Sequence, residues 1–284
     1  MSADAKPLDG ARVLVTRSQE QAPHFCAQLE ALGALVYAVP VISIEGPADW
    51  QPVDEALRSL DRYNWIVFAS SNAARFFVER SRQLGVLAQL KHTPVAAIGP
   101  STARALAQNE IIAAFVPSQS IAEQFVIEFP QRVRIREKKI LWPRGNLGRM
   151  LIAEALTEQG AVVEAVECYR NTPPKEQNAA ARELATLLKE KKLTHVVLTS
   201  GQSAKSFADL AVAGLAGRSV EQAIEYEDRQ AEMLADFVRD VIVASIGPET
   251  SRACREFIGK VDVEAAVHTI DGLCEALSNQ HLET

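Results

Sequence analysis

Hydrogen-bond donors recur along the chain where an apolar run ends and an amphipathic helix is about to begin. They are Arg17, Ser70–Ser71, Ser101–Thr102, Arg144, Thr199–Ser200 and Glu249–Thr250. The first N–H groups of a helix have no partners and carry partial positive charge, and hydroxyl and guanidinium groups add further donors beside them. Such a set suits a ligand that carries several carboxylates or phosphates, so the pattern predicts a polyanion site.

Two turns of matching composition, at 99–102 and 247–250, both open with Gly-Pro and close on threonine. Glycine lets the backbone approach a ligand closely, proline favours the first helical turn, and threonine can cap the helix or donate a hydrogen bond. One such turn needs no explanation beyond a well-capped helix. Two matching turns, together with the two Ser/Thr turns, favour a functional role.

The familiar signatures of nucleotide binding and nucleophilic catalysis are missing from the sequence. It contains no G-x-G-x-x-G, no G-x-x-x-x-G-K-[ST] and no G-x-S-x-G. The five histidines are scattered, without H-x-x-x-H or a His/Cys cluster, so we expect no metal. A donor-rich site without an obvious base indicates that the substrate supplies its own reactivity and the protein controls its shape.

Composition limits the partners and the compartment. Of 284 residues, 48% are apolar and 23% charged, and the net charge of −6 argues against non-specific nucleic-acid binding. The N-terminus lacks the basic and apolar regions of a secretory signal, and no apolar run approaches the roughly 20 residues of a membrane helix. None of the four cysteines forms a C-x-x-C pair, which is typical of reduced thiols. We expect a cytoplasmic monomer without membrane or nucleic-acid partners.

The donors are positioned by a strand–turn–helix–strand pattern that occurs twice. Residues 142–170 begin at the end of an apolar run, pass through a glycine-containing turn and a helix, and end on a second apolar run. Residues 11–42 follow the same plan. Arg17 corresponds to Arg144 and Gly33 to Gly160, since 144 − 17 and 160 − 33 both equal 127.

Two further segments also recur. The run from Trp65 into a helix matches the run from His195, with an offset of 130, and Gly99-Pro100 matches Gly247-Pro248, with an offset of 148. The difference between these offsets predicts an insertion of about 18 residues, charged and helical, near 215–232. The chain therefore contains two copies of one α/β unit.

Short apolar strands that alternate with helices are the signature of doubly wound parallel sheets with crossover helices. In such sheets ligands bind beyond the carboxyl ends of the strands, which is where all the donors fall. One strand is predicted over 34–44. Pro40 in its middle indicates an edge strand or an isolated ribbon.

The pattern resembles the uroporphyrinogen-III synthases, cofactor-free cyclases of tetrapyrrole biosynthesis. The resemblance covers nearly the whole chain, and its most specific residues are Arg144-Gly145-Asn146, Gly148-Arg149, Gly160-Ala161, Val163 and Glu167 two residues before Tyr169. The start VLVTR at 13–17, the Ser-Ser turn, the Ile-Gly-Pro turns and the Thr199-Ser200-Gly201 turn also fit. The resemblance implies that no cofactor is needed.

The same resemblance implies a domain arrangement that the repeats alone do not give. The family begins one domain, crosses to build the second and then returns, with two ribbon strands at the crossings. Transferred to this sequence, the first α/β domain is discontinuous over 1–38 and 173–284, and the second covers 46–165. The interdomain ribbon is then 39–45 with 166–172. The expected fold is two similar doubly wound parallel-sheet domains joined by a two-stranded ribbon.

The substrate implied by the resemblance is hydroxymethylbilane, a linear tetrapyrrole rich in carboxylates. The family expels its terminal hydroxyl as water, inverts the last pyrrole ring through a spiro intermediate and closes the macrocycle. Tyr169 matches the tyrosine proposed to assist the departure of the hydroxyl. The family's carboxylate-binding positions are matched by the turns Ser70–Ser71, Ser101–Thr102, Thr199–Ser200 and Glu249–Thr250. Further candidates for substrate binding are Arg17, Arg144 and Gly201. For Arg144, an ion pair that supports the turn is as good an explanation as a substrate contact.

Two details of the match leave questions for the structure. Glu249 departs from the small or hydroxyl residue common at its position, so the backbone N–H groups and Thr250 are the better donors there. Strand alternation predicts Glu167 and Tyr169 on one face and Cys168 on the other.

The alternative function is a non-catalytic two-domain binding module for a small polyanion. Tyr169 argues against this alternative, because a protein that only binds a ligand does not need that tyrosine.

Overall fold

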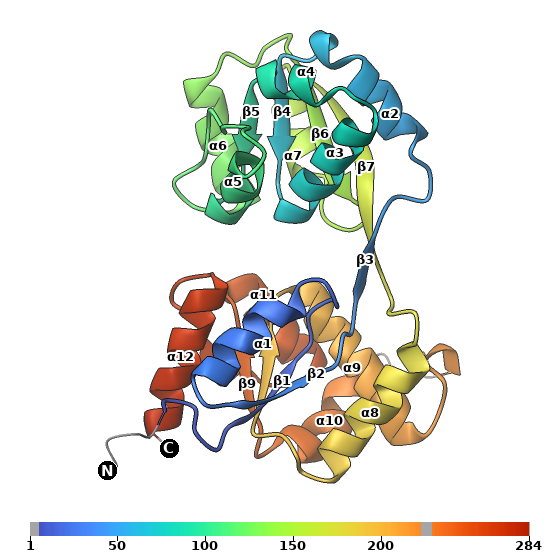
Figure 1. Ribbon diagram of the computed structural model, residues 1–284, viewed down its shortest axis with the longest axis vertical. Coiled ribbons are helices and arrows are strands. Elements are labelled where there is room, and N and C mark those ends of the chain that lie inside the picture. Colours follow the sequence, from blue (N-terminus) through green and yellow to red (C-terminus); the bar gives the residue numbers. More distant parts are fainter. Residues whose placement is uncertain (1–5, 223–228, 284) are drawn as a thin grey trace. The chain divides into compact units, whose positions relative to one another are not determined.

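The computed structural model describes residues 6–222 and 229–283 (Figure 1). Its internal contacts divide the chain into two compact units. Unit 1 comprises Met1–Ser43 and Thr172–Thr284, and unit 2 comprises Ile44–Asn171. Each unit is built on its own five-stranded sheet.

The unit 1 sheet has the strand order β10-β9-β8-β1-β2, and every neighbouring pair is parallel. The strands are β1 (Arg12–Val15), β2 (Leu35–Ala38), β8 (His195–Leu198), β9 (Ile242–Ser245) and β10 (Val263–Glu264). In chain order this is 2-1-3-4-5, the arrangement of flavodoxin-like doubly wound sheets.

Helices cover both faces of the unit 1 sheet. They are α1 (Ala22–Ala31), α8 (Gln177–Lys189), α9 (Gly201–Ala216), α10 (Gln230–Val238), α11 (Pro248–Phe257) and α12 (Ile270–Glu283). Successive residues of β8 point to opposite layers. Val196 and Leu198 pack with α8 to α11, whereas Val197 packs with α1 and α12. A strand buried on both faces accounts for the uninterrupted apolar run in the sequence.

The unit 2 sheet has the order β3-β7-β6-β4-β5, with parallel pairing among β7, β6, β4 and β5. The strands are β3 (Ser43–Glu45), β4 (Trp65–Phe68), β5 (Val95–Ala97), β6 (Lys139–Gly145) and β7 (Val162–Thr172). The helices are α2 (Gln51–Arg58), η1 (Leu60–Arg62), α3 (Ser71–Gln83), α4 (Leu87–His92), α5 (Pro100–Ala107), α6 (Ala122–Arg132) and α7 (Leu151–Glu158). The core on one face contains residues of α2 to α5, and the core on the other contains residues of α6 and α7.

Apart from the edge strand β3, the two sheets have matching orders, β2-β1-β8-β9 in unit 1 and β7-β6-β4-β5 in unit 2. The offsets read from the sequence pair β1 with β6, β8 with β4 and β9 with β5, and the members of each pair have corresponding neighbours. Even the short β10 has a counterpart. Val263 pairs with Ala244, and Phe115 bridges Ala96 in parallel, so that 263 − 115 and 244 − 96 both equal 148. The predicted α/β fold with two similar parallel sheets is confirmed.

The prediction of a single strand over 34–44 is wrong. The structure has two strands there, β2 in the unit 1 sheet and β3 beside β7 in the unit 2 sheet, with Pro40 between them. Proline lacks the N–H that a continuing ladder needs.

The ribbon boundaries 39–45 and 166–172 stay a prediction. Of the predicted insertion, 223–228 lie outside the described residues, α9 ends at Ala216 and α10 begins at Gln230.

A histidine is buried at the start of β8. His195 is 1% exposed, its Nδ1 lies 2.7 Å from Thr194 Oγ1, and its buried Nε2 has no hydrogen-bond partner among the described residues. Burial, with the neighbouring His281 ring centred 5.6 Å away, lowers the pKa of His195 from 6.5 to about 4. The folded protein therefore keeps this histidine neutral under conditions in which the unfolded chain binds a proton.

We expect acid to destabilise the protein through this histidine. Because the folded-state pKa lies below the unfolded value, the contribution of His195 to stability is complete above pH 6.5. It is lost as the pH falls from 6.5 towards about 4. Urea unfolding across this range should show a steeper loss of unfolding free energy in the wild type than in His195→Phe. Equal slopes in the two proteins would contradict the expectation.

Candidate functional site

A pocket of about 240 Å³ opens at the carboxyl ends of the unit 2 strands. Three of the residues predicted for the site line it: Ser70, Arg144 and Tyr169. The others come from the ends of β4 and β6, the following loop, the start of α7 and the start of α6: Ala69, Ala122, Trp142, Pro143, Gly145, Leu147, Gly148, Arg149, Leu151 and Ile152. The location agrees with the rule for open α/β sheets.

The pairing of β6 explains why this edge of the sheet is open. On one side, its ladder with β4 ends at the pair Ile66 and Leu141. On the other side, its ladder with β7 continues to the pair Gly145 and Tyr169. Pro143 lies in the part of β6 that is paired only to β7, and it has no N–H to donate towards β4. The last residues of β6 are therefore free to line a pocket beside the end of β4.

Tyr169 is held in the pocket on three sides. Its phenol oxygen accepts a hydrogen bond of 3.2 Å from Ser70 Oγ, which itself caps α3 by accepting from Ala73 N at 3.1 Å. Its ring stacks on Phe76, with centroids 6.0 Å apart and planes 15° apart. The remaining side lies against the backbone of Gly145, as described below. Because Ser70 is the donor to the phenol, the phenol's own proton is not committed to Ser70.

The expected alternation along β7 fails at Cys168. The pairing of β6 with β7 shifts by one residue at this point, because Arg144 is opposite Glu167 while Gly145 is opposite Tyr169. Cys168 is thus the extra residue of a β-bulge. Its Sγ lies 3.8 Å from Ala73 O, so Cys168 and Tyr169 both contact α3 instead of facing opposite sides.

Burial controls the protonation of the Tyr169 phenol. Desolvation is the largest influence and raises its pKa above the ordinary value of 10.0, while the hydrogen bond from Ser70 acts in the opposite direction and is smaller. Cys168 also raises this pKa and Arg144 lowers it, both to a lesser extent. The phenol therefore remains protonated at neutral pH and can serve as a hydrogen-bond donor or a general acid.

Arg144 braces the loop that follows β6. Its guanidinium donates to Gly148 O at 2.7 Å and to Leu147 O at 3.3 Å, contacts Met150 Sδ at 3.0 Å, and lies over the Trp142 ring at 5.0 Å. These contacts hold the loop in a closed turn. This arginine also lines the pocket, so these contacts support the turn while the predicted contact of Arg144 with substrate stays a prediction.

Asn146 fastens the loop to β7. Its Nδ2 donates to Asn171 O at 3.2 Å, its Oδ1 accepts from Asn171 N at 2.9 Å, and its backbone N donates to Tyr169 O at 3.2 Å. The side-chain amide thus replaces a peptide group and extends the ladder past the end of β6. This arrangement fixes the backbone of β7 on the carboxyl side of Tyr169.

Arg149 extends the positive edge of the pocket. It forms an ion pair of 2.6 Å with Glu123 in the first turn of α6. Both side chains are about half exposed, at 64% and 47%, so solvent screens the pair and it contributes little to stability. A carboxylate-bearing ligand can compete with Glu123 for this arginine at low cost.

The remaining predicted residues lie at the carboxyl ends of other strands. In unit 1, Ser200 caps α9 in a capping box with Ser203, and Thr199 precedes it. Arg17 follows β1 and donates to Gln21 Oε1 at 2.9 Å. Its buried Nε has no hydrogen-bond partner within 6–222 and 229–283, and burial lowers the pKa of its guanidinium. Gly201 opens α9 and Thr250 lies in the first turn of α11.

The threonines of the two Gly-Pro turns point inward. Thr102 is 1% exposed and Thr250 is 4% exposed, whereas Ser101 is exposed at the start of α5. Ser71 is half-buried as the first residue of α3. Among the hydroxyl groups of these turns, the exposed one is therefore that of Ser101.

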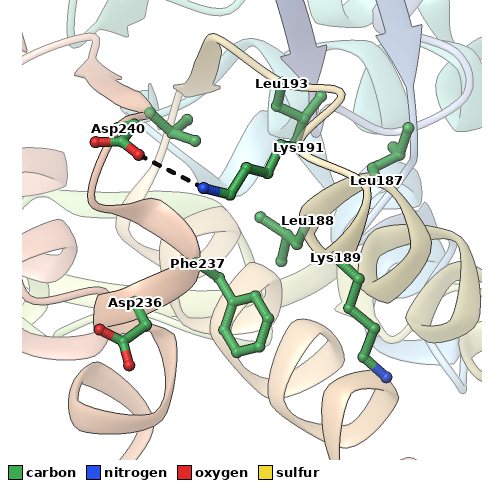
Figure 2. A pocket seen from close by; sticks show the side chains of 9 residues that line it. Leu187, Leu188, Lys189, Lys191, Leu193, Asp236, Phe237 and Asp240 are labelled. Atoms are coloured by element: carbon green, nitrogen blue, oxygen red, sulfur yellow. Dashed lines mark ion pairs between the residues drawn. The ribbon is translucent and has the colours of Figure 1, made fainter.

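A second pocket, of about 170 Å³, lies in unit 1 at the amino end of β8 (Figure 2). Leu188, Leu193 and Phe237 supply apolar walls, and Lys191 pairs with Asp240 at 4.0 Å on its rim. No residue predicted for the site is among its lining residues. It lies at the edge of the sheet opposite to the one where this fold binds ligands.

Two findings concern the described residues as a whole. Within 6–222 and 229–283, no helix is long and apolar enough to cross a membrane. In the same ranges, no group of three or more His, Cys, Asp and Glu side chains is placed to hold a metal ion.

Comparison with known proteins identifies the family. The sequence profile described as Uroporphyrinogen-III synthase HemD matches residues 23–275. The chain belongs to the uroporphyrinogen-III synthase family. The uroporphyrinogen-III synthase of Synechococcus elongatus is 32% identical, over 98% of this chain and 98% of that protein. The synthase of Chlorobaculum parvum is 28% identical over 88% and 91%. The family consists of cyclising lyases of porphyrin biosynthesis, and the binding-module alternative has no support among these relatives.

Solved structures show the same fold. A uroporphyrinogen III synthase from Thermus thermophilus aligns with a TM-score of 0.62 and 18% identity, over 96% of this chain and 99% of that one. The synthase of Helicobacter pylori aligns with a TM-score of 0.56 and 18% identity, over 93% and 96%. At such identities the likeness concerns the fold alone.

The local sequence pattern does not predict the contacts that hold Tyr169. Phe76 lies in a helical run, and Gly145 and Asn146 belong to the most specific part of the family resemblance. A signal existed for the last two, because Arg144-Gly145-Asn146 was the most specific part of the resemblance. Nothing in the local pattern around Phe76 connects it with Tyr169.

Proposed function

We propose that this chain converts hydroxymethylbilane into uroporphyrinogen III, with Tyr169 assisting the departure of the terminal hydroxyl as water. The observation that carries the proposal is the state of the Tyr169 phenol. It lies in a pocket at the carboxyl edge of a sheet, accepts from Ser70 at 3.2 Å, and is kept protonated by burial. A protonated phenol with an uncommitted O–H group can donate to an oxygen that leaves.

The size of the pocket supports a division of the substrate among several sites. Ligand pockets usually measure roughly 300–1,000 Å³. A volume of about 240 Å³ accepts one substituted pyrrole ring, not a whole linear tetrapyrrole. We assign this pocket to the terminal ring that bears the hydroxymethyl group. Arg149, whose ion pair with Glu123 is exposed to solvent, is then the group placed to receive a carboxylate of that ring.

The remaining carboxylates are assigned to the donor turns at the strand ends. The assigned residues are Arg17, Ser71, Ser101, Thr102, Thr199, Ser200, Gly201 and Thr250. Thr102 and Thr250 are buried, so at these two turns we assign the carboxylates to the amides that begin the helices and to the exposed Ser101. In this proposal the turns fold the substrate, and the electron-rich pyrrole expels water with help from Tyr169.

The state of the cysteines bears on the cellular compartment of the protein. The four cysteines are free, and burial raises the pKa of the Cys254 and Cys274 thiols, which lowers their reactivity. Free buried thiols are typical of proteins in reducing compartments, which supports a cytoplasmic enzyme. The monomer expected from the sequence stays a prediction.

Product analysis tests the proposed function. Purified protein is incubated with hydroxymethylbilane, the products are oxidised to porphyrins, and the isomers are separated by chromatography. We expect isomer III to dominate at catalytic amounts of protein. Hydroxymethylbilane cyclises without enzyme to isomer I, so isomer I alone, at the rate of the protein-free control, would refute the assignment.

A further inference from the structure

The Tyr169 ring lies directly against the backbone of Gly145. A Cβ atom built on Gly145 would lie 2.6 Å from Tyr169 Cζ and 2.9 Å from its Cε2 and its phenol oxygen. Contacts below about 3.0 Å do not occur for real Cβ atoms, so any side chain at residue 145 must displace the ring. The clash falls on the hydroxyl end of the tyrosine, which is the end assigned to the chemistry.

The glycine is not required by its own backbone conformation. Gly145 is absent from the positive-φ glycines, which include its neighbour Gly148 at φ 110°. An alanine at residue 145 could adopt the same backbone without the strain of a left-handed conformation. What the structure requires at residue 145 is the absence of a side chain.

The other supports of Tyr169 leave its ring no equivalent position nearby. Phe76 stacks on the ring, and Ser70 Oγ holds the phenol oxygen while it also caps α3. Asn146 fastens β7 just beyond the tyrosine. A ring displaced from Gly145 must therefore move towards the open side of the pocket and lose the hydrogen bond from Ser70.

We propose that Gly145 is a positioning residue for Tyr169, which lets the ring rest on the β6 backbone so that the phenol meets the leaving oxygen. The inference rests on the proposed function of Tyr169. Gly145 itself contacts no reacting atom in this scheme. Gly145 affects turnover only through the position of the Tyr169 hydroxyl group. A misplacement of about 1 Å can lower a rate by up to about 100-fold.

A double-mutant cycle separates this role from damage to the fold or to the pocket. Gly145→Ala should lower kcat about tenfold, with KM changed less than about twofold. In the Tyr169→Phe background the same change should alter kcat less than about twofold, because no hydroxyl remains to be misplaced. If the new methyl group instead blocked the pocket, the loss would persist in both backgrounds and the proposal would be overturned.

A matched control tests for general damage. Gly46 also packs against an aromatic ring in unit 2, since a Cβ there would lie 2.8 Å from Trp50, but Trp50 does not line the pocket. Gly46→Ala should cost similar stability and leave kcat unchanged. An unfolded Gly145→Ala protein, with Gly46→Ala folded, would assign the glycine a structural role and refute the proposal.

A titration provides a readout that does not depend on turnover. The chain has four tyrosines, so the ultraviolet difference between a protein and its Tyr169→Phe counterpart isolates this phenol. In Gly145→Ala the exposed phenol should titrate at lower pH than in the wild type. An unshifted titration would overturn the inference. If Tyr169→Phe itself kept wild-type turnover, the assignment of Tyr169 would fail instead, and the two failures are thus distinguishable.

Discussion

Tyr169→Phe should lower kcat about 100-fold while the protein folds normally, still binds hydroxymethylbilane and still forms isomer III as its main product. The change keeps the ring stacked on Phe76 and removes only the hydroxyl that accepts from Ser70. Positioned proton donors contribute roughly 10²–10⁴-fold. We expect the lower end of that range because the bilane also closes without enzyme. Single-turnover measurements with product chromatography follow both the rate and the isomer ratio.

The control for this variant is Tyr37→Phe, which removes a phenol hydroxyl from β2 in unit 1. It should leave kcat unchanged. Wild-type turnover in Tyr169→Phe would reduce Tyr169 to a packing residue and leave the donor turns as the whole mechanism. A switch of the product to isomer I would show instead that the hydroxyl orients the terminal ring.

The pH dependence of the wild-type and Tyr169→Phe rates tests whether the Tyr169 phenol acts in its protonated form. The active form is the neutral phenol, and burial raises its pKa above 10.0, so the protonated fraction stays complete through the neutral and mildly alkaline range. The ratio of wild-type to Tyr169→Phe rates should be constant from about pH 7 to 9 and fall only at higher pH. If the ratio already falls as the pH rises from about 7 to 8, the Tyr169 phenol is not a buried, neutral donor.

The fold could be predicted from the sequence because its evidence is local and occurs twice. Apolar runs, helix periods and glycine turns each mark an element over a few residues, and the offset of 148 links Ala96 and Phe115 to Ala244 and Val263 in both sheets. Sheet membership is not local. The run 34–44 is continuous in the sequence, yet its two halves pair with different strands, and only Pro40 indicated the break.

For the candidate site, too, the features that depend on neighbouring residues could be predicted and those that depend on strand pairing could not. Ser70 and Ser200 could be found because N-capping depends on the next few residues, and both are N-caps in the structure. The surroundings of Tyr169 depend on strand pairing. The bulge at Cys168 arises between two strands, and Phe76 belongs to a helix far away in the chain. Gly145 has an ordinary backbone conformation, so no turn signal revealed why a side chain is excluded there.

Gly214 presents the largest expected effect on stability, and it has the opposite sign to the usual rule. In a helix interior, replacement of glycine by alanine normally stabilises by about 1 kcal/mol. Here α9 packs so closely on α8 that a Cβ on Gly214 would lie 2.0 Å from Ala181 O and 3.0 Å from Ala185 Cβ. The first contact is with backbone, which cannot rotate aside, so one helix must move.

We therefore expect Gly214→Ala to lower the free energy of unfolding of unit 1 by about 3 kcal/mol, the upper end of the range for overpacked cores, despite the gain in helix propensity. Gly217→Ala, at the C-cap of the same helix with φ 66° and open space around it, should cost only about 1 kcal/mol of backbone strain. Hydrogen exchange should show lost protection in α8 and α9 and unchanged protection in α3 of unit 2. A Gly214→Ala protein as stable as the wild type would mean that the two helices pack less closely than described.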